Sequence, residues 1–254
     1  MNDTPVASEG ADRAEHQVPA LQDLDLVWQA MKPAQLSDKH LAKNRIVSAA
    51  RNDPAHVSFD MLRTRLLLAM RENGWTRVAI SSPTSGCGKS FVAANLAVAL
   101  ARRDSCRTVL MDFDLRTPML AKLFGVTPEA DMQEYLGGHI APEDFLQRVG
   151  HNLALGLVKE PAENPAELLQ EAMTSEVLDE VQDVFCPEMM IFDVPAVLEH
   201  DDLVAFLPNV DGVIYVVGGG KSKAEEVLEA ERLLGGIKPL LGVVLNKAEG
   251  VISY

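Results

Sequence analysis

The chain has 254 residues, of which 47% are hydrophobic, and its formal net charge is −14 at pH 7. This length and hydrophobic content suit one globular domain with an additional segment. The negative charge, with no offsetting cluster of lysine and arginine, disfavours binding to nucleic acid and to anionic membrane surfaces. We therefore expect neither as a direct partner.

The cysteines and the N-terminus indicate a reducing compartment. Cys87, Cys106 and Cys186 are isolated and form no C-x-x-C pair, which is typical of reduced thiols rather than of disulfides. The acidic N-terminus lacks the apolar segment of a secretion signal. The longest apolar run, 91–101, is too short to cross a bilayer. We expect a cytoplasmic protein without a transmembrane segment.

Residues 1–54 are expected to be an N-terminal extension. Residues 1–20 are rich in Ala, Asp, Glu and Pro and lack periodicity, which is typical of a disordered tail. The stretch 21–31 could be a short docking helix joined to the body by a linker through about Pro54, or a tail with a chance pattern. The helical spacing is carried by Leu21, Leu24, Val27 and Trp28.

Residues 55–254 read as one domain that starts with an amphipathic helix over 56–72. We expect its apolar residues to cover a sheet and Arg63 and Arg65 to face outward, where they could bind an acidic partner or a neighbouring subunit, or be ordinary solvated side chains. The apolar residues are Leu62, Leu66, Leu67 and Met70.

From residue 75 onward, apolar runs alternate with helical patterns such as 91–103 and 224–234. This alternation predicts an α/β fold with a mostly parallel central sheet and helices on both faces. The runs are apolar on both faces, as a sheet covered on both sides requires. The expected strands are 77–81, 107–113, 153–158, 189–194, 212–217 and 240–246.

Residues 82–90, SPTSGCGKS, resemble the phosphate-loop pattern G-x-x-x-x-G-K-[ST], with Pro83 at the place of the first glycine. A phosphate loop leaves a buried strand, turns through glycines and opens a helix whose N-terminus faces the anion. The run VAIS and the apolar helix after Lys89 supply that context. We expect the loop to bind ATP, with the proline tolerated because the first glycine only eases a turn.

Lys89 is expected to reach the β- and γ-phosphates, and the Ser90 hydroxyl to bind Mg²⁺. Cys87 lies inside the loop but has no partner base nearby in the sequence, so we expect a small filling residue rather than a catalytic thiol. The predicted ATP-binding residues of the loop are Thr84, Ser85, Gly86, Cys87, Gly88, Lys89, Ser90 and Phe91.

Three acidic residues follow apolar strands, where doubly wound sheets bind ligands. Asp112 and Asp114 end LMDFD, one helical crossover after the loop, and Asp193 ends MMIFD. Asp193 has the usual form of the second acid associated with Mg²⁺, and Asp112 and Asp114 are expected at the ligand-binding edge; the alternative is that all three acids only cap strands. Asn246, past the last strand, could contact adenine through its amide, or be an ordinary strand-end residue.

Together these segments resemble the bacterial tyrosine kinases of capsule and exopolysaccharide synthesis (BY-kinases of the CpsD/CapB type), within the wider class of ParA/MinD-like ATPases. The resemblance covers about 59–251. It is carried by FDMLRTRLLLAM (59–70), SPTSGCGKSFVAANLAVALA (82–101), VLMDFDLRTPMLAKLFG (109–125), NPAELL (164–169), MIFDVPAVL (190–198), DGVIYVV (211–217) and LLGVVLNKAE (240–249).

The resemblance implies Mg-ATP at the carboxyl edge of the sheet and phosphorylation of tyrosine. It implies that Asp112 binds Mg²⁺ or accepts the tyrosine proton, with Asp114 and Asp193 supporting the metal, so that Lys89 and these three acids are the expected catalytic residues. It also implies activation by the cytosolic tail of a membrane polysaccharide chain-length regulator, peripheral location through that partner, and ring-like self-association.

The sequence departs from the family at two places. The family's self-association motif, E-x-x-R-x-x-R, matches only Arg63, because Val57 and Asp60 stand at the other positions. In place of several C-terminal tyrosines the chain has Tyr254 alone, our candidate phosphoacceptor; Tyr135 and Tyr215 are expected to be packing residues. The alternatives to a kinase are a ParA/MinD-like ATPase switch, although Thr84 replaces that class's usual lysine, and an ATP-binding regulator that docks on the membrane partner.

Overall fold

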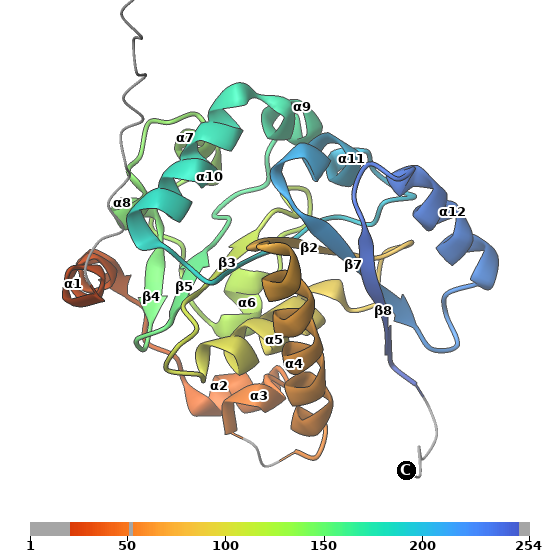
Figure 1. Cartoon of the computed structure of the whole chain (residues 1–254), viewed down its shortest axis with the longest axis horizontal. Helices are drawn as coiled ribbons and strands as arrows, with labels where there is room; N and C mark the ends of the chain where they lie inside the picture. The colour runs from red at the N-terminus through yellow and green to blue at the C-terminus, as the bar shows by residue number, and fades with distance from the viewer. Residues whose placement is uncertain (1–20, 51–52, 249–254) are drawn as a thin grey trace, which may run out of the picture.

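The computed structural model describes residues 21–50 and 53–248 (Figure 1). In this part of the chain, eight strands form one sheet in the order β1-β4-β5-β3-β6-β2-β7-β8. The strands are β1 (Lys32–Pro33), β2 (Arg77–Ser81), β3 (Thr108–Asp112), β4 (Gln147–Val149), β5 (Leu153–Gly156), β6 (Met189–Asp193), β7 (Gly212–Gly218) and β8 (Leu240–Asn246).

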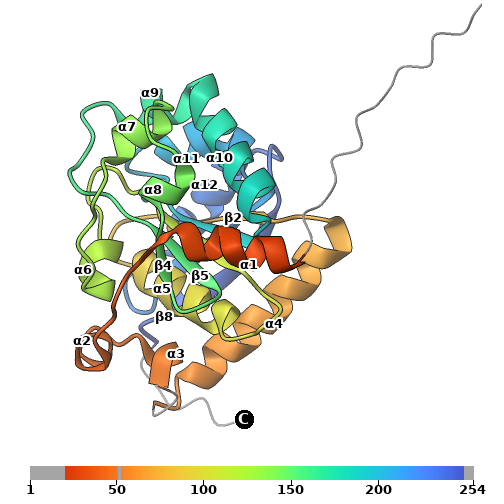
Figure 2. The same ribbon diagram turned by 90° about the vertical axis from the view of Figure 1, so that its left-hand side faces the viewer.

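Helices cover both faces of the sheet (Figures 1 and 2). None of the helices within 21–50 and 53–248 is long and apolar enough to cross a membrane. The helices are α1 (Leu21–Ala30), α2 (Asp38–Lys43), α3 (Val47–Ala50), α4 (His56–Asn73), α5 (Lys89–Ala101), α6 (Leu120–Phe124), α7 (Met132–Leu136), α8 (Pro142–Phe145), α9 (Pro165–Gln170), α10 (Ala172–Phe185), α11 (Asp202–Phe206), the 3-10 helix η1 (Leu207–Asn209) and α12 (Ala224–Leu234).

The predicted α/β class is confirmed, because neighbouring strands are parallel except for β4 and β5. Successive residues of a strand alternate between two cores. Val109 and Met111 of β3 pack with the α10 side, whereas Leu110 packs with α4 and α5 on the other side. All six predicted strands are present. The short strands β1 and β4 were not predicted, since neither carries an apolar run.

The strand register gathers the expected acids at one edge of the sheet. Asp112 at the end of β3 lies opposite Asp193 at the end of β6, and Asp193 in turn lies opposite Ile80 of β2. The phosphate loop leaves β2 one residue later, after Ser81. Three neighbouring carboxyl ends therefore bring the loop and the acids together.

Residues 21–50 contact the rest of the fold, and the division into an extension through Pro54 and a domain from residue 55 stays a prediction. The helix predicted within 21–31 is present as α1, but Trp28 is only 2% exposed and its indole N–H donates to the carbonyl of Phe185 at 2.8 Å. After α1, β1 pairs with β4, and Leu41 joins the core on the α5 side. Four side chains of this segment are buried in the two cores, namely Trp28, Met31, Leu41 and Ile46.

The first long helix of the body, α4, matches the helix predicted over 56–72, but one of its arginines differs from the prediction. Arg65 is exposed as expected. Arg63 instead lies against α5, where its guanidinium donates to the Ala99 carbonyl at 3.2 Å and pairs with Asp60 at 2.7 Å. Carbonyls in the last turn of a helix have no intrahelical partner, which makes them acceptors for such a side chain.

We predict that Trp28→Ala lowers the free energy of unfolding by about 3–5 kcal/mol, because it removes a buried aromatic side chain from the core. Leu26→Ala on the same helix is the control, since Leu26 is 66% exposed. Urea unfolding followed by circular dichroism measures both. Equal stability of the two variants would show that α1 does not contribute to the fold.

Candidate active site

The segment between β2 and α5 has the geometry of a phosphate loop. Gly86 and Gly88 have φ of 73° and 93°, values that favour glycine, and Gly88 directly precedes α5. A Cβ atom on Gly88 would lie 2.2 Å from Nδ2 of Asn246. Pro83 uses only its carbonyl, which accepts from the Leu198 N–H at 3.1 Å. The proline therefore fits a position where no N–H donor is needed.

The residues after β8 hold the loop from one side. The Asn246 side-chain N–H₂ donates to the carbonyl of Cys87 at 2.9 Å, and Lys247 Nζ donates to the carbonyl of Gly86 at 2.8 Å. Cys87 is buried, with its sulfur 3.3 Å from the Ser222 hydroxyl, as a filling residue would be. The N–H₂ group of the Asn246 amide is bonded to the loop, so only its oxygen is left for adenine, and that contact stays a prediction.

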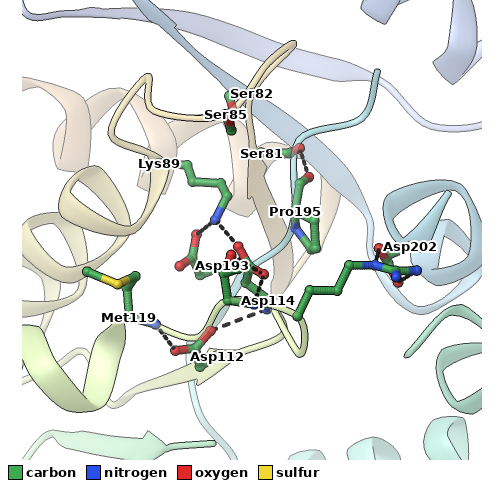
Figure 3. A network of polar contacts seen from close by, with 12 residues as sticks. Ser81, Ser82, Ser85, Lys89, Asp112, Asp114, Met119, Asp193, Pro195 and Asp202 are labelled. Carbon is green, nitrogen blue, oxygen red and sulfur yellow. Dashed lines mark hydrogen bonds and ion pairs between the residues drawn. The ribbon is translucent and has the colours of Figure 1, made fainter. Parts of the chain in front are cut away.

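Lys89 extends from the first turn of α5 into the group of acids (Figure 3). Its Nζ is 2.5 Å from Oδ2 of Asp114 and 3.7 Å from Oδ1 of Asp193. Burial by itself would lower the pKa of Lys89, but the carboxylates of Asp193 and Asp114 outweigh burial and raise the pKa. Lys89 is thus a charged lysine at the inner end of the loop.

Asp112 is fully buried, and its carboxylate accepts three backbone N–H groups (Figure 3). Oδ2 accepts from Met119 at 3.0 Å and Leu120 at 2.9 Å, and Oδ1 accepts from Asp114 at 3.2 Å. Burial and the neighbouring carboxylate of Asp193 raise the pKa of Asp112 well above its ordinary value. The geometry makes Asp112 an organiser of the segment that carries Asp114 and begins α6.

Asp193 is fully buried, and neither of its carboxylate oxygens has a hydrogen-bond partner among the described residues. Burial raises its pKa, and Lys89 offsets part of that increase. No group of three or more His, Cys, Asp or Glu within 21–50 and 53–248 could hold a metal by itself. Mg²⁺ commonly takes one or two protein ligands and completes its shell with water and phosphate, so Asp193 and the nearby Ser90 fit this ion.

A cavity of about 320 Å³ opens over the loop. Five of the predicted residues do not line it, namely Thr84, Cys87, Asp112, Asp193 and Asn246. The lining residues are Ser85, Gly86, Gly88, Lys89, Ser90, Phe91, Asp114, Thr117, Met119, Leu123, Pro195, Ala196, Glu199, His200 and Lys247.

Arg116 and Glu199 are among the contributing residues that were not predicted. Arg116 bonds the buried Asp202 at the start of α11 at 2.8 Å, which ties the segment after β3 to the segment after β6. Glu199 accepts the Ser85 N–H at 2.6 Å. The sequence has no local signal for either contact, because each joins segments more than 80 residues apart.

The family of CobQ/CobB/MinD/ParA nucleotide binding domains matches residues 78–252. The putative tyrosine-protein kinase EpsB of Ralstonia nicotianae is 31% identical over 200 residues, which are 77% of this chain and 26% of EpsB. The tyrosine-protein kinase YwqD of Bacillus subtilis is 32% identical over 188 residues, 73% of this chain and 78% of YwqD. The chain thus spans about a quarter of the first relative and most of the second.

Among solved structures, the kinase domain of the Escherichia coli tyrosine kinase ETK superposes with a TM-score of 0.74 at 26% identity, covering 82% of this chain and 83% of that domain. The likeness therefore extends over most of this chain and most of that domain. The fold and the resemblance expected from the sequence are both confirmed.

We predict that stability without Mg²⁺ and nucleotide depends on the ionisation of Asp193. The folded state holds the proton of this carboxyl more tightly than the unfolded chain does, so the protonated Asp193 adds to the free energy of unfolding. This added stability is complete below the unfolded pKa of about 3.9 and is lost as the pH rises through the raised folded pKa. Asp193→Asn should therefore lose less stability than the wild type as the pH is raised over a range that starts at about 4. Urea unfolding across this range, with the exposed Asp104→Asn as control, tests this; parallel curves would contradict it.

Proposed function

Because this chain belongs to the CobQ/CobB/MinD/ParA family of nucleotide-binding domains and to its bacterial tyrosine-kinase branch, we propose that it transfers the γ-phosphoryl group of Mg-ATP to tyrosine. The observation that carries the proposal is the convergence of Lys89 with three buried carboxylates beside a phosphate loop. Phosphoryl transfer needs positioning and charge stabilisation more than covalent chemistry, and this arrangement supplies both.

In this proposal the loop N–H groups and Lys89 bind the phosphates, and Ser90 and Asp193 hold Mg²⁺. When bound, Mg²⁺ would neutralise charge that develops on the phosphates. Asp114 lines the cavity, whereas Asp112 does not. Asp114 is therefore better placed than Asp112 to accept the proton of a tyrosine hydroxyl, and Asp112 acts through the backbone that it organises.

We place Tyr254 as the phosphoacceptor, although it lies outside the described residues. The other two tyrosines are unsuited, since Tyr135 and Tyr215 are fully buried and burial raises the pKa of each. The tail starts at the rim of the cavity, because Lys247 lines it. Tyr254 follows Ala248 by six residues, which span at most about 20 Å. It could therefore reach the cavity of its own subunit or that of an adjoining subunit.

The proposed setting is the cytoplasmic side of the membrane, where the chain docks on the cytosolic tail of a polysaccharide chain-length regulator. This part rests on the family resemblance. If subunits associate into a ring through α4, Arg65 would contact the neighbouring subunit, because it is exposed. Arg63 is bonded to the Ala99 carbonyl within the domain.

We predict that Lys89→Ala weakens Mg-ATP binding at least tenfold, because contacts of an ammonium with phosphate in a preorganised site contribute a few kcal/mol. Ser90→Ala should also weaken binding, without removing a buried charge. Titration with a fluorescent ATP analogue measures both, and circular dichroism checks the fold. Lys43→Ala, on the exposed side of α2, is the control. Equal affinities of all four proteins would refute the nucleotide site.

We predict that incubation with Mg-ATP puts phosphate on Tyr254, and that Lys89→Ala abolishes this modification. Tyr254→Phe should remove the phosphotyrosine but leave nucleotide binding unchanged. Mass spectrometry of the intact and digested protein, with and without a candidate partner tail, tests this. Steady ATP hydrolysis without phosphotyrosine would instead identify an ATPase switch.

A further inference from the structure

One N–H group of the phosphate loop is already bonded to a protein carboxylate. The Ser85 N–H donates to Oε1 of Glu199 at 2.6 Å, and both residues line the cavity over the loop. The N–H groups of such a loop are the donors that bind phosphate oxygens. The carboxylate of Glu199 thus occupies a position suited to an anionic oxygen.

Backbone pairing between two loops puts Glu199 there. The Val197 N–H donates to the Ser82 carbonyl at 2.9 Å, and the Leu198 N–H donates to the Pro83 carbonyl at 3.1 Å. These bonds advance together along both segments and end at the Ser85–Glu199 contact. The Glu199 side chain itself is exposed, so it can turn into solvent while the paired backbone stays in place.

The contact lies toward the outer end of the loop. Lys89 and the N-terminus of α5 form the inner end, where Lys89 is bonded to Asp114. Ser85 comes four positions earlier and lies beside the segment that follows Asp193. If the phosphates nearer the nucleoside lie at the start of α5, the terminal phosphate of a nucleotide would lie toward Ser85. There its negative charge would repel the Glu199 carboxylate.

We propose that Glu199 discriminates between nucleoside triphosphates and diphosphates. Its carboxylate keeps the Ser85 N–H when a diphosphate is bound, and the terminal phosphate of a triphosphate displaces it. Glu199 therefore lowers the affinity for the triphosphate relative to the diphosphate. This inference rests on the proposed nucleotide function and adds to it a residue that responds to the length of the phosphate chain.

The test measures the affinities of Mg-ADP and of a non-hydrolysable ATP analogue with Mg²⁺ by isothermal titration calorimetry. Glu199→Gln keeps the size and the acceptor oxygen but removes the charge, and Glu199→Ala removes both. Glu188→Gln is the matched control, because Glu188 likewise accepts a backbone N–H, that of Arg107 at 2.5 Å. This contact lies before β3 and β6, at the ends of the strands opposite to the phosphate loop. In both Glu199 variants we expect the analogue to bind about three- to fivefold more tightly relative to ADP, a size typical of exposed charges.

The control should keep the wild-type ratio of the two affinities. An unchanged or reduced preference for the analogue in the Glu199 variants, with ADP still bound, would overturn this inference and leave the nucleotide site standing. Failure of the wild-type protein to bind either nucleotide would overturn both.

Discussion

The ammonium group of Lys89 lies between the carboxylates of Asp114 and Asp193, and the arrangement of the carboxyl edge depends on this contact. Buried carboxylates are tolerated only when a cation or hydrogen bonds compensate them. Asp112 uses backbone N–H groups and Asp114 uses Lys89, which leaves the oxygens of Asp193 without hydrogen bonds among the described residues. The site therefore holds a buried carboxylate that accepts no hydrogen bond from the described part of the chain and has the Lys89 ammonium 3.7 Å away as its nearest cation.

The conformation of the phosphate loop depends on two surrounding segments as well as on its own glycines. The segment after β6 pairs with its first half, and Asn246 and Lys247 bond its later carbonyls. These contacts use carbonyl groups of the loop, so its remaining N–H groups stay directed toward an anion. A substitution in either neighbouring segment would consequently change the conformation of the loop and so its binding of phosphate, without itself contacting a nucleotide.

Much of the fold was predictable because its signals are local. The apolar runs of the long strands, the glycines around Lys89 and the acids that end β3 and β6 can each be recognised within a few residues. The missed features depend on tertiary contacts. Arg63 lies against a carbonyl of α5, and Glu199 meets the loop only because two segments pair in register. The strands β1 and β4 are too short and too polar to show a period.

The first and last strands of the described chain form the two opposite sides of the sheet, with β1 at one end of the strand order and β8 at the other. Figure 1 shows α1, which leads into β1, far from β8. Anything joined before α1 would hold the domain by the side remote from the phosphate loop, whereas anything joined after β8 starts beside Lys247 at the cavity. A tether on the first side would leave the cavity accessible, and a tail on the second side would share the space through which substrates arrive.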